Sequence, residues 1–258
     1  MKIEFLTQED PIYLLPFFDE FFRHYASEFE VVQVSCCPVM GKRSRWKMIR
    51  ELTCLYGGLG FVRLGFQAVG SRALSVFPGR QRFYTIEHVC HAFGVPYKRI
   101  GNPNSADFVE EIRRRAPDLV LSVACPFIFK QALLNVAPLG CINVHHAPLP
   151  RYRGMMPTFW QMFHGERVAG LTVHYVNAEI DKGDVLLRDN LTIEPGESLD
   201  HLIRRSKRHA AHSMATVARQ IGANTQRVIK MPVEDGSYFT FPTLDEIREF
   251  RRRGLRAI

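Results

Sequence analysis

The sequence predicts an α/β fold built on a mainly parallel sheet. Short runs rich in Val, Leu and Ile alternate with segments of helical pattern along the chain. Residues 118–123 form a continuous apolar run, which is typical of a parallel strand buried on both faces. With 46% hydrophobic and 23% charged residues among 258, the chain is apolar enough to fold around a core, so disorder is excluded as its main state.

The strand predictions rest on alternating or Val-rich runs bounded by turn signals. The run at residues 30–37 is the richest in Val, and residues 141–145 repeat the continuous apolar pattern of residues 118–123. The predicted strands cover residues 2–6, 30–37, 97–100, 118–123, 141–145, 171–176 and 185–187.

The helix predictions rest on end signals. Asp10 is placed to cap a helix over residues 13–25, with Pro11 at its first position. Ser105 is placed as the N-cap of a second helix that closes on three arginines, and this charge order suits the helix dipole. Two further helices are predicted over residues 85–93 and 199–221.

The composition changes near Leu199, where a basic, amphipathic segment begins. We therefore predict a main domain over residues 1–198 and a short, basic helical extension over residues 199–258. The formal charge of +8 suits an anionic partner, such as a phosphate, a nucleotide, a polyglutamylated cofactor, a nucleic acid or a membrane surface. Clusters such as residues 204–208 and 251–253 are also typical of solvated helix faces.

The cysteines and the start of the chain favour a cytoplasmic protein. The six cysteines show no zinc-site spacing and no disulfide framework, and no signal peptide opens the sequence. We expect no metal site.

An apolar stretch at residues 48–77 needs a separate explanation. Four charged residues interrupt it, so no run reaches the length of an uncharged membrane-spanning helix. We favour a buried or lid-forming pair of helices, with an amphipathic interfacial helix as the alternative.

Asn143, His145 and Asp181 are the candidate catalytic residues. Asn143 and His145 are two residues apart at a predicted strand end, so their side chains share a face where parallel sheets place ligand crevices. Asp181 precedes a turn signal that leads into the next strand, from which its carboxylate could reach the imidazole. Each residue also has a structural interpretation, as a satisfied histidine or as a turn former. We interpret His146, which faces the other side, as structural.

The same region resembles a known family. The segments Asn143-Val144-His145, Leu149-Pro150, Arg151-Tyr152-Arg153-Gly154 and Asp181-Lys182-Gly183-Asp184 are similar, in order and separation, to those of the 10-formyltetrahydrofolate-dependent formyltransferases. The resemblance is strong over residues 118–199, weaker over residues 1–117, and local or absent in the tail. It departs at Ala147 and Pro148, where the family usually has Ser and Leu.

The resemblance implies a Rossmann-like formyltransferase sheet with helices on both faces, and a catalytic domain over residues 1–198. It implies a one-carbon group transferase with 10-formyltetrahydrofolate as donor. In formyl transfer an amine attacks a formyl carbon, an oxyanion develops, and the attacking nitrogen loses a proton. Asn143 offers an N–H to the oxyanion, His145 contacts the oxyanion or relays the proton, and Asp181 orients the imidazole or holds a water.

The resemblance also implies the binding residues. The donor site is expected within about residues 118–190, and an acceptor role is expected for the basic loop. Phe127 and Phe129 could instead pack a helix start. The expected donor-binding residues are Cys125, Pro126, Phe127, Ile128, Phe129, Ile180 and Asp181, and the expected acceptor-binding residues are Arg151, Arg153 and Gly154.

Three differences between this chain and enzymes that resemble it limit the kinds of acceptor amine that we expect. Enzymes that formylate methionyl-tRNA add a β-barrel, whereas only roughly 60 residues follow Leu199 here. The enzyme that formylates glycinamide ribonucleotide has a Gly-rich phosphate loop where this chain has "TQEDPIYLL" at residues 7–15. The hydrolase relative carries a regulatory domain in front of the core, and this chain begins with the core.

We therefore predict a small amine acceptor, phosphorylated or nucleotide-linked, of the sugar N-formyltransferase kind, acted on by a homodimer. DNA is not expected, and tRNA and peripheral membrane contact are disfavoured. A methionyl-tRNA formyltransferase-like activity is one alternative. A non-catalytic protein that binds RNA or a membrane surface on the same core is another.

Overall fold

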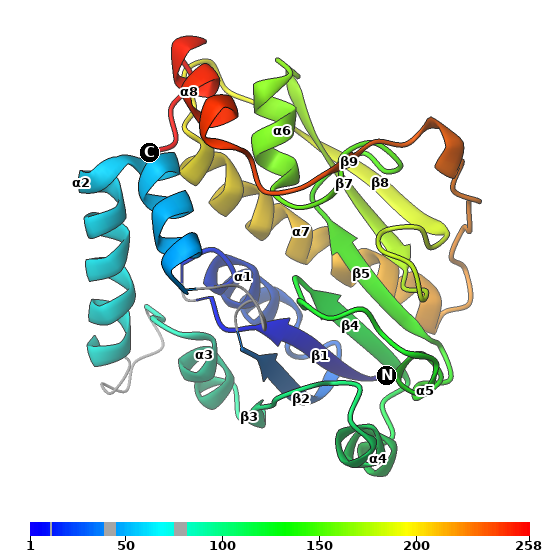
Figure 1. The fold of residues 1–258 in the computed structure, drawn as a ribbon. Coiled ribbons are helices and arrows are strands. Elements are labelled where there is room, and N and C mark those ends of the chain that lie inside the picture. The colour runs from blue at the N-terminus through cyan, green and yellow to red at the C-terminus, as the bar shows by residue number, and fades with distance from the viewer. Residues whose placement is uncertain (11, 39–44, 75–81) are drawn as a thin grey trace.

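A computed structural model describes residues 1–10, 12–38, 45–74 and 82–258. Its centre is a seven-stranded sheet (Figure 1). The first five strands in spatial order are parallel, and the last two run antiparallel to their neighbours, so the predicted mainly parallel sheet is confirmed. In that order the strands are β3 (Tyr97–Arg99), β2 (Glu30–Cys37), β1 (Lys2–Gln8), β4 (Leu119–Val123), β5 (Cys141–His145), β7 (Val168–Tyr175) and β8 (Val185–Thr192).

Helices cover both faces of the sheet, as predicted. On one face lie α1 (Leu15–Tyr25), α3 (Ile86–Ala92) and α7 (Leu199–Gly222), and on the other lie α4 (Ala106–Arg115) and α5 (Gln131–Leu134). Strand β4 shows why helices are needed on both faces of the sheet. Leu121 packs in the apolar core beneath α1, α3 and α7, and Val120 packs in the core beneath α4 and α5.

Phenylalanines fill the larger core. Phe5 of β1 meets the rings of Phe17 and Phe21 edge to face, with centroids 6.1 and 5.0 Å apart. Helix α7 packs into this same core through Met214. Ser198 is the N-cap of α7, and its Oγ accepts a hydrogen bond from the His201 N–H at 3.3 Å. Because α7 packs into the core of the sheet, the division into domains at residue 198 stays a prediction.

A second apolar cluster lies beyond the carboxyl ends of the parallel strands. It joins α2 (Arg45–Leu74), α6 (Pro157–Phe163) and α8 (Leu244–Arg252) (Figure 1). Helix α2 is broken at Gly57, whose φ of 76° and ψ of 162° are not helical. Arg251 of α8 donates to the backbone carbonyls of Cys54 and Leu55 beside this break.

The apolar stretch thus forms a pair of helical segments, although its residues 75–77 lie outside the described part of the chain. One window of α2, Ile49–Ser71, is long and apolar enough to cross a membrane by length and composition alone. The break at Gly57 interrupts this window.

The tail returns to the middle of the chain. After the short 3₁₀ helix η1 (Val233–Asp235), β9 (Tyr238–Phe239) pairs in parallel with β6 (Arg153–Gly154). A capping box at Thr243 and Glu246 then starts α8.

Several element ends differ from the prediction for local reasons. Helix α1 begins at Leu15 because the Asp10 carboxylate accepts from the N–H groups of Ile12 and Tyr13, which form a turn before the helix. Pro11, its predicted first residue, lies outside the described residues. Ser105 occupies the N-cap of α4 but makes no side-chain capping bond. Strand β8 extends to Thr192 because it pairs along most of β7.

Candidate active site

A cavity of about 840 Å³ opens at the carboxyl ends of β1, β4 and β5. Asn143, His145 and Asp181 all line it, together with residues of α2 and of the C-terminal tail. The two strand residues reach it because alternate side chains of β5 share a face, as the spacing predicts.

His145 and Asp181 form the closest titratable pair among the predicted residues. His145 Nδ1 lies 3.5 Å from Asp181 Oδ2, and both side chains are largely buried. The other ring nitrogen, Nε2, lies 2.8 Å from the carbonyl oxygen of Tyr152 and must donate to it. A neutral ring with this hydrogen bond has its unprotonated Nδ1 on the side of Asp181.

Asn143 is held by a residue that the sequence interpretation missed. His174 of β7 is its cross-strand partner, and Asn143 Nδ2 lies 3.2 Å from His174 Nε2. His174 Nδ1 lies 2.7 Å from the Tyr175 carbonyl and donates to it, so Nε2 must accept from the amide. This arrangement fixes the orientation of the amide and leaves one Nδ2 hydrogen for another acceptor.

Burial makes His174 a neutral ring. Its side chain is almost fully enclosed, and desolvation lowers its pKa to about 4 although Asp181 opposes that shift. His174 Nε2 lies 3.8 Å from Asp181 Oδ1, so the carboxylate stands between two imidazoles that differ in hydrogen bonding.

A tight backbone contact fixes Asp181. Its Oδ2 accepts from the Gly154 N–H at 3.0 Å, and Asp181 itself has a φ of 51°. Gly154 has a φ of 94°, and a Cβ there would lie 2.3 Å from the Phe239 carbonyl oxygen. Only glycine therefore allows β6 to approach β9 this closely.

A second polar group lies deeper in the cavity wall. Lys207 of α7 donates to His146 Nε2 at 2.7 Å, and His146 Nδ1 lies 2.7 Å from Ser206 Oγ. Burial lowers the pKa of Lys207 to about 8, with Asp10 opposing the shift, and burial moves the pKa of His146 well below its ordinary value. His146 points to α7, which agrees with a structural role, and sequence reasoning missed Lys207.

All seven residues predicted to bind the donor line the cavity. Residues 124–129 form one side and the loop with Ile180 and Asp181 forms another. Ile128 and Ile180 are 55% and 43% exposed in total, whereas Phe129 is buried in the core behind the loop. Phe129 therefore packs as well as lines, and Ile128 and Ile180 offer open apolar surface for a flat ring.

Only one of the three residues predicted to bind the acceptor is among the described residues that line the cavity. Gly154 lines the cavity, but Arg151 and Arg153 are not among the described residues that do. The Arg151 guanidinium instead donates to Glu166 Oε1 at 3.0 Å. An acceptor contact by either arginine stays a prediction.

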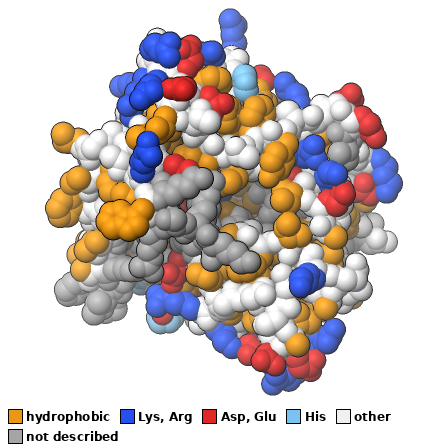
Figure 2. Space-filling model, viewed as in Figure 1, with side chains coloured by type: hydrophobic (Ala, Val, Ile, Leu, Met, Phe, Trp, Pro, Cys, Tyr) orange, Lys and Arg blue, Asp and Glu red, His pale blue; other side chains and the backbone are white. Residues whose placement is uncertain are grey.

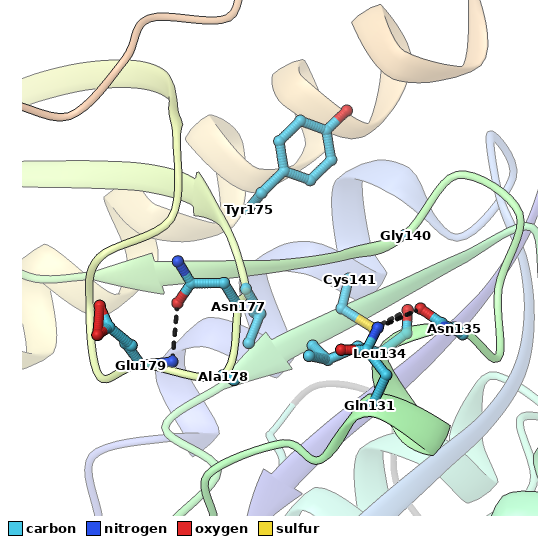
Figure 3. A pocket seen from close by; sticks show the side chains of 10 residues that line it. Gln131, Leu134, Asn135, Gly140, Cys141, Tyr175, Asn177, Ala178 and Glu179 are labelled. Atoms are coloured by element: carbon cyan, nitrogen blue, oxygen red, sulfur yellow. Dashed lines mark hydrogen bonds between the residues drawn. The ribbon is translucent and has the colours of Figure 1, made fainter.

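Figure 3 shows another hollow, of about 550 Å³, which shares residues 176, 177 and 179 with the larger cavity. Asn177 Oδ1 accepts from the Glu179 N–H at 3.0 Å, and Gln131 donates to Asn135 at 2.8 Å. This hollow contains none of the three predicted catalytic side chains. We therefore place the candidate active site in the larger cavity.

The comparison with protein families decides the identity. Residues 81–218, which are more than half of the chain, match the model described as "Formyl transferase". The chain belongs to the formyl transferase family. The resemblance noted in the sequence is therefore confirmed.

Three formyltransferases illustrate the range of acceptors in this family. The methionyl-tRNA formyltransferase of Acetivibrio thermocellus is 34% identical over 54% of this chain and 44% of its own length. The phosphoribosylglycinamide formyltransferase of Anaplasma phagocytophilum shares the fold at 13% identity, with a TM-score of 0.61 over 93% of this chain and 98% of its own. A sugar 3N-formyltransferase solved with dTDP and 5-N-formyltetrahydrofolate aligns at 14% identity, with a TM-score of 0.57 over 100% of this chain and 82% of its own. The matched region spans less than half the length of the methionyl-tRNA enzymes.

In the part of this formyltransferase that the structure describes, no three His, Cys, Asp or Glu residues are arranged to hold a metal ion. The cavity wall has two imidazoles around one carboxylate, with an amide beside them. These side chains are suited to hydrogen bonding and proton movement.

The cavity contains residues of this formyltransferase that sequence reasoning missed. His174 had a signal, since it is the one ionisable imidazole in the predicted strand at residues 171–176. Lys207 is one of several basic residues of α7, and no feature of the neighbouring sequence distinguishes it from the others. Further missed residues come from α2 and the tail, among them Leu52, Tyr56, Leu64, Tyr238 and Phe241, and others from the end of β1 and the start of α6.

Proposed function

We propose that this formyltransferase moves a formyl group from 10-formyltetrahydrofolate to the primary amine of a small acceptor, with nucleotide-linked amino sugars as the candidate class. The observation that carries the proposal is the meeting of Asn143, His145 and Asp181 in one cavity, with 3.5 Å between the imidazole and the carboxylate. Bound donor supplies the activated formyl group, and the residues of the chain bind, orient and move protons.

Asn143 is the proposed donor to the formyl oxygen. Its Nδ2 keeps one hydrogen free after the bond to His174, and that hydrogen stabilises negative charge as it develops on the oxygen. Removal of one such donor typically costs about 10² to 10³ in turnover.

His145 and Asp181 are the proposed proton relay. Because His145 Nε2 is committed to the Tyr152 carbonyl, the ring takes up a proton at Nδ1, on the side of Asp181. The attacking nitrogen gives up its proton in this direction, and the same proton then goes to the nitrogen that leaves the formyl carbon. These contacts favour the relay over a direct contact between His145 and the oxyanion.

The charge of the cavity wall supports an amine acceptor. Five carboxylates line it, namely Glu9, Asp10, Glu51, Glu179 and Asp181, whereas Lys207 is the one Lys or Arg among the described lining residues. Arg99 and Lys182 pair with Glu9 and Glu179, and burial raises the pKa of Asp10, so the support rests mostly on Glu51 and Asp181. A primary amine arrives largely as a cation and is attracted to such a wall. The same charges give less support to a diphosphate inside the cavity, so a nucleotide portion would lie at its rim.

The turn before α1 occupies the place where the glycinamide ribonucleotide enzymes have their phosphate loop. Its hydrogen bonds disfavour a ribonucleotide phosphate there. The backbone N–H groups of Ile12 and Tyr13 donate to the Asp10 carboxylate at 2.9 Å each. A phosphate would need such groups free. Methionyl-tRNA is the runner-up acceptor, because the curated relatives with the higher sequence identity act on it by name.

We also infer a cytoplasmic enzyme, since all six cysteines are free thiols. The decisive experiment supplies purified protein with 10-formyltetrahydrofolate and, in parallel, a panel of nucleotide-linked amino sugars and methionyl-tRNA. Formylated sugar detected by mass spectrometry, with loss of product in Asn143→Ala, is expected. Formylation of methionyl-tRNA alone would promote the runner-up, and no transfer to any amine would favour a binding role.

A further inference from the structure

Helix α2 presents an apolar face that no other described residue covers. Leu59, Val62, Phe66 and Val69 are 92%, 54%, 75% and 69% exposed. Their spacing of three, four and three residues places them along one side of the helix. Figure 2 shows hydrophobic side chains projecting from the edge of the molecule where Figure 1 places α2.

The other side of the same helical segment is already in use. Phe61, Leu64 and Ala68 line the cavity, and Leu64 belongs to the second core cluster. The inner face thus holds α2 against the protein, and packing within the described chain does not explain why the outer face is apolar.

Charge and a tryptophan on α2 indicate what this face would meet. Arg63 belongs to the segment that carries the apolar row, and Trp46 and Arg50 belong to the segment before the break at Gly57. The sequence of α2 contains five Lys or Arg and one Glu. Its net charge of +4 is half of the formal charge of +8 of the whole chain. Arg50 and Arg63 are exposed. Trp46, at the start of α2, is 81% exposed. Basic residues bind anionic headgroups, and tryptophan favours the boundary between headgroups and acyl chains.

We propose that α2 docks this protein onto an anionic lipid bilayer and lies in the plane of the headgroups. The break at Gly57 disfavours a spanning helix, because residues 58–74 would extend only about 26 Å, less than a hydrocarbon core of about 30 Å. In this arrangement the exposed apolar side chains would dip into the bilayer and the arginines would meet the phosphates, while the inner side of the helix stays packed on the protein. This proposal rests on the surface of α2 and is independent of formyl transfer.

The test uses the fluorescence of the native chain. It has two tryptophans, and Trp160 is only 4% exposed, so a change on binding would report Trp46. With vesicles of equal parts phosphatidylcholine and phosphatidylglycerol, we expect a blue shift, quenching by brominated acyl chains and flotation with the vesicles. These effects should weaken in pure phosphatidylcholine and at high salt, and Trp46→Phe should remove the spectral change.

Matched variants separate this surface from a general effect. Val62→Asp should weaken binding to the anionic vesicles about tenfold or more, while Val228→Asp, at a similarly exposed valine elsewhere (51%), should not. Arg63→Gln should weaken binding about fivefold, while Arg114→Gln on α4 makes the same change of charge with little effect.

Three outcomes would overturn the proposal. The first is the absence of any shift or flotation with anionic vesicles, and the second is equal weakening by Val62→Asp and Val228→Asp. The third is a dimer in light scattering that Val62→Asp dissociates while vesicles bind neither form, which would assign the face to a second copy of the chain. Each result leaves the formyl-transfer assay unaffected, so the two proposals can fail separately.

Discussion

The carboxylate of Asp181 lies between two imidazoles that differ in their hydrogen bonds and in the effect of burial. His145 Nδ1 is 3.5 Å from one oxygen and His174 Nε2 is 3.8 Å from the other. His174 is locked as a neutral acceptor by its bond to the Tyr175 carbonyl and by burial. At the residue scale, one ring is therefore the proposed proton carrier, and the other holds Asn143.

His145→Ala and Asp181→Ala should each lower kcat by about 10² to 10⁴ while the affinity for the formyl donor changes little. Because the two groups act as a unit, the double variant should be little slower than either single one. The measurement is steady-state kinetics with donor binding followed separately, and His201→Ala on the exposed side of α7 is the control. Multiplicative loss in the double variant would mean that the residues act independently.

The buried His174 makes the stability of the protein depend on pH. Its pKa is about 4 in the folded protein against 6.5 for an unperturbed histidine, so between these values the unfolded chain binds the extra proton. The free energy of unfolding should therefore fall by about 3 kcal/mol as the pH falls from 6.5 to 4, and be unaffected by this group above that window.

Urea unfolding across this pH range measures the effect. His174→Gln should flatten the pH dependence by about the same 3 kcal/mol, whatever its effect on stability at neutral pH. His201→Gln, a change at an exposed histidine, should leave the slope intact. An unchanged slope in His174→Gln would show that this ring is not the titrating group.

At the scale of elements, the active site depends on a two-residue pairing between distant segments. Strand β9 of the tail sits against β6, and the same Gly154 that permits the pairing donates its N–H to Asp181. The tail therefore positions a proposed catalytic carboxylate without contributing a catalytic group of its own.

Gly154→Ala should lower kcat about 10²-fold, because a Cβ would push β9 away and displace the hydrogen bond to Asp181. Gly165→Ala is the matched control, since Gly165 also has a positive φ, of 75°, but its Cβ would meet no atom within 4 Å. Both variants incur the strain of a left-handed residue, about 1–2 kcal/mol. Kinetics and thermal unfolding of the pair separate strain from steric displacement, and equal losses of kcat would refute the steric explanation.

At the scale of the whole molecule, stability and catalysis reside in different layers. The phenylalanine cluster of β1 and α1 lies on the sheet face covered by α1, α3 and α7, whereas the cavity opens at the strand ends beneath α2. Phe5 meets four rings of α1 and is fully buried.

Phe5→Ala should therefore reduce the free energy of unfolding by about 3–5 kcal/mol, through lost burial and a residual cavity. Turnover per folded molecule should be nearly unchanged, because Phe5 does not line the cavity. Chemical denaturation with activity assays on the native fraction provides the measurement, and Phe66→Ala, at a ring that is 75% exposed, should change stability by less than about 0.5 kcal/mol. A loss of turnover that matches the loss of stability would show that core and site are coupled.

Local sequence patterns were enough to predict the sheet and to place two candidate residues, Asn143 and His145, at one strand end. The apolar runs at residues 118–123 and 141–145 form adjacent parallel strands, and the two-residue spacing puts Asn143 and His145 on one face. These features depend on near neighbours along the chain, because strand periodicity and turn chemistry are set within a few residues. The family resemblance supplied the link to Asp181.

The remaining features depended on tertiary structure. The antiparallel register that sets His174 opposite Asn143, the return of β9 to Gly154 and the closure of the cavity by α2 all join segments far apart in the sequence. So does the burial that lowers the pKa of Lys207 and of His174. Such contacts are decided by how whole elements pack and exclude water, and no window of the sequence records that outcome. The sequence by itself determined which chemical groups the site has; the tertiary structure determined which of them meet and in what protonation state.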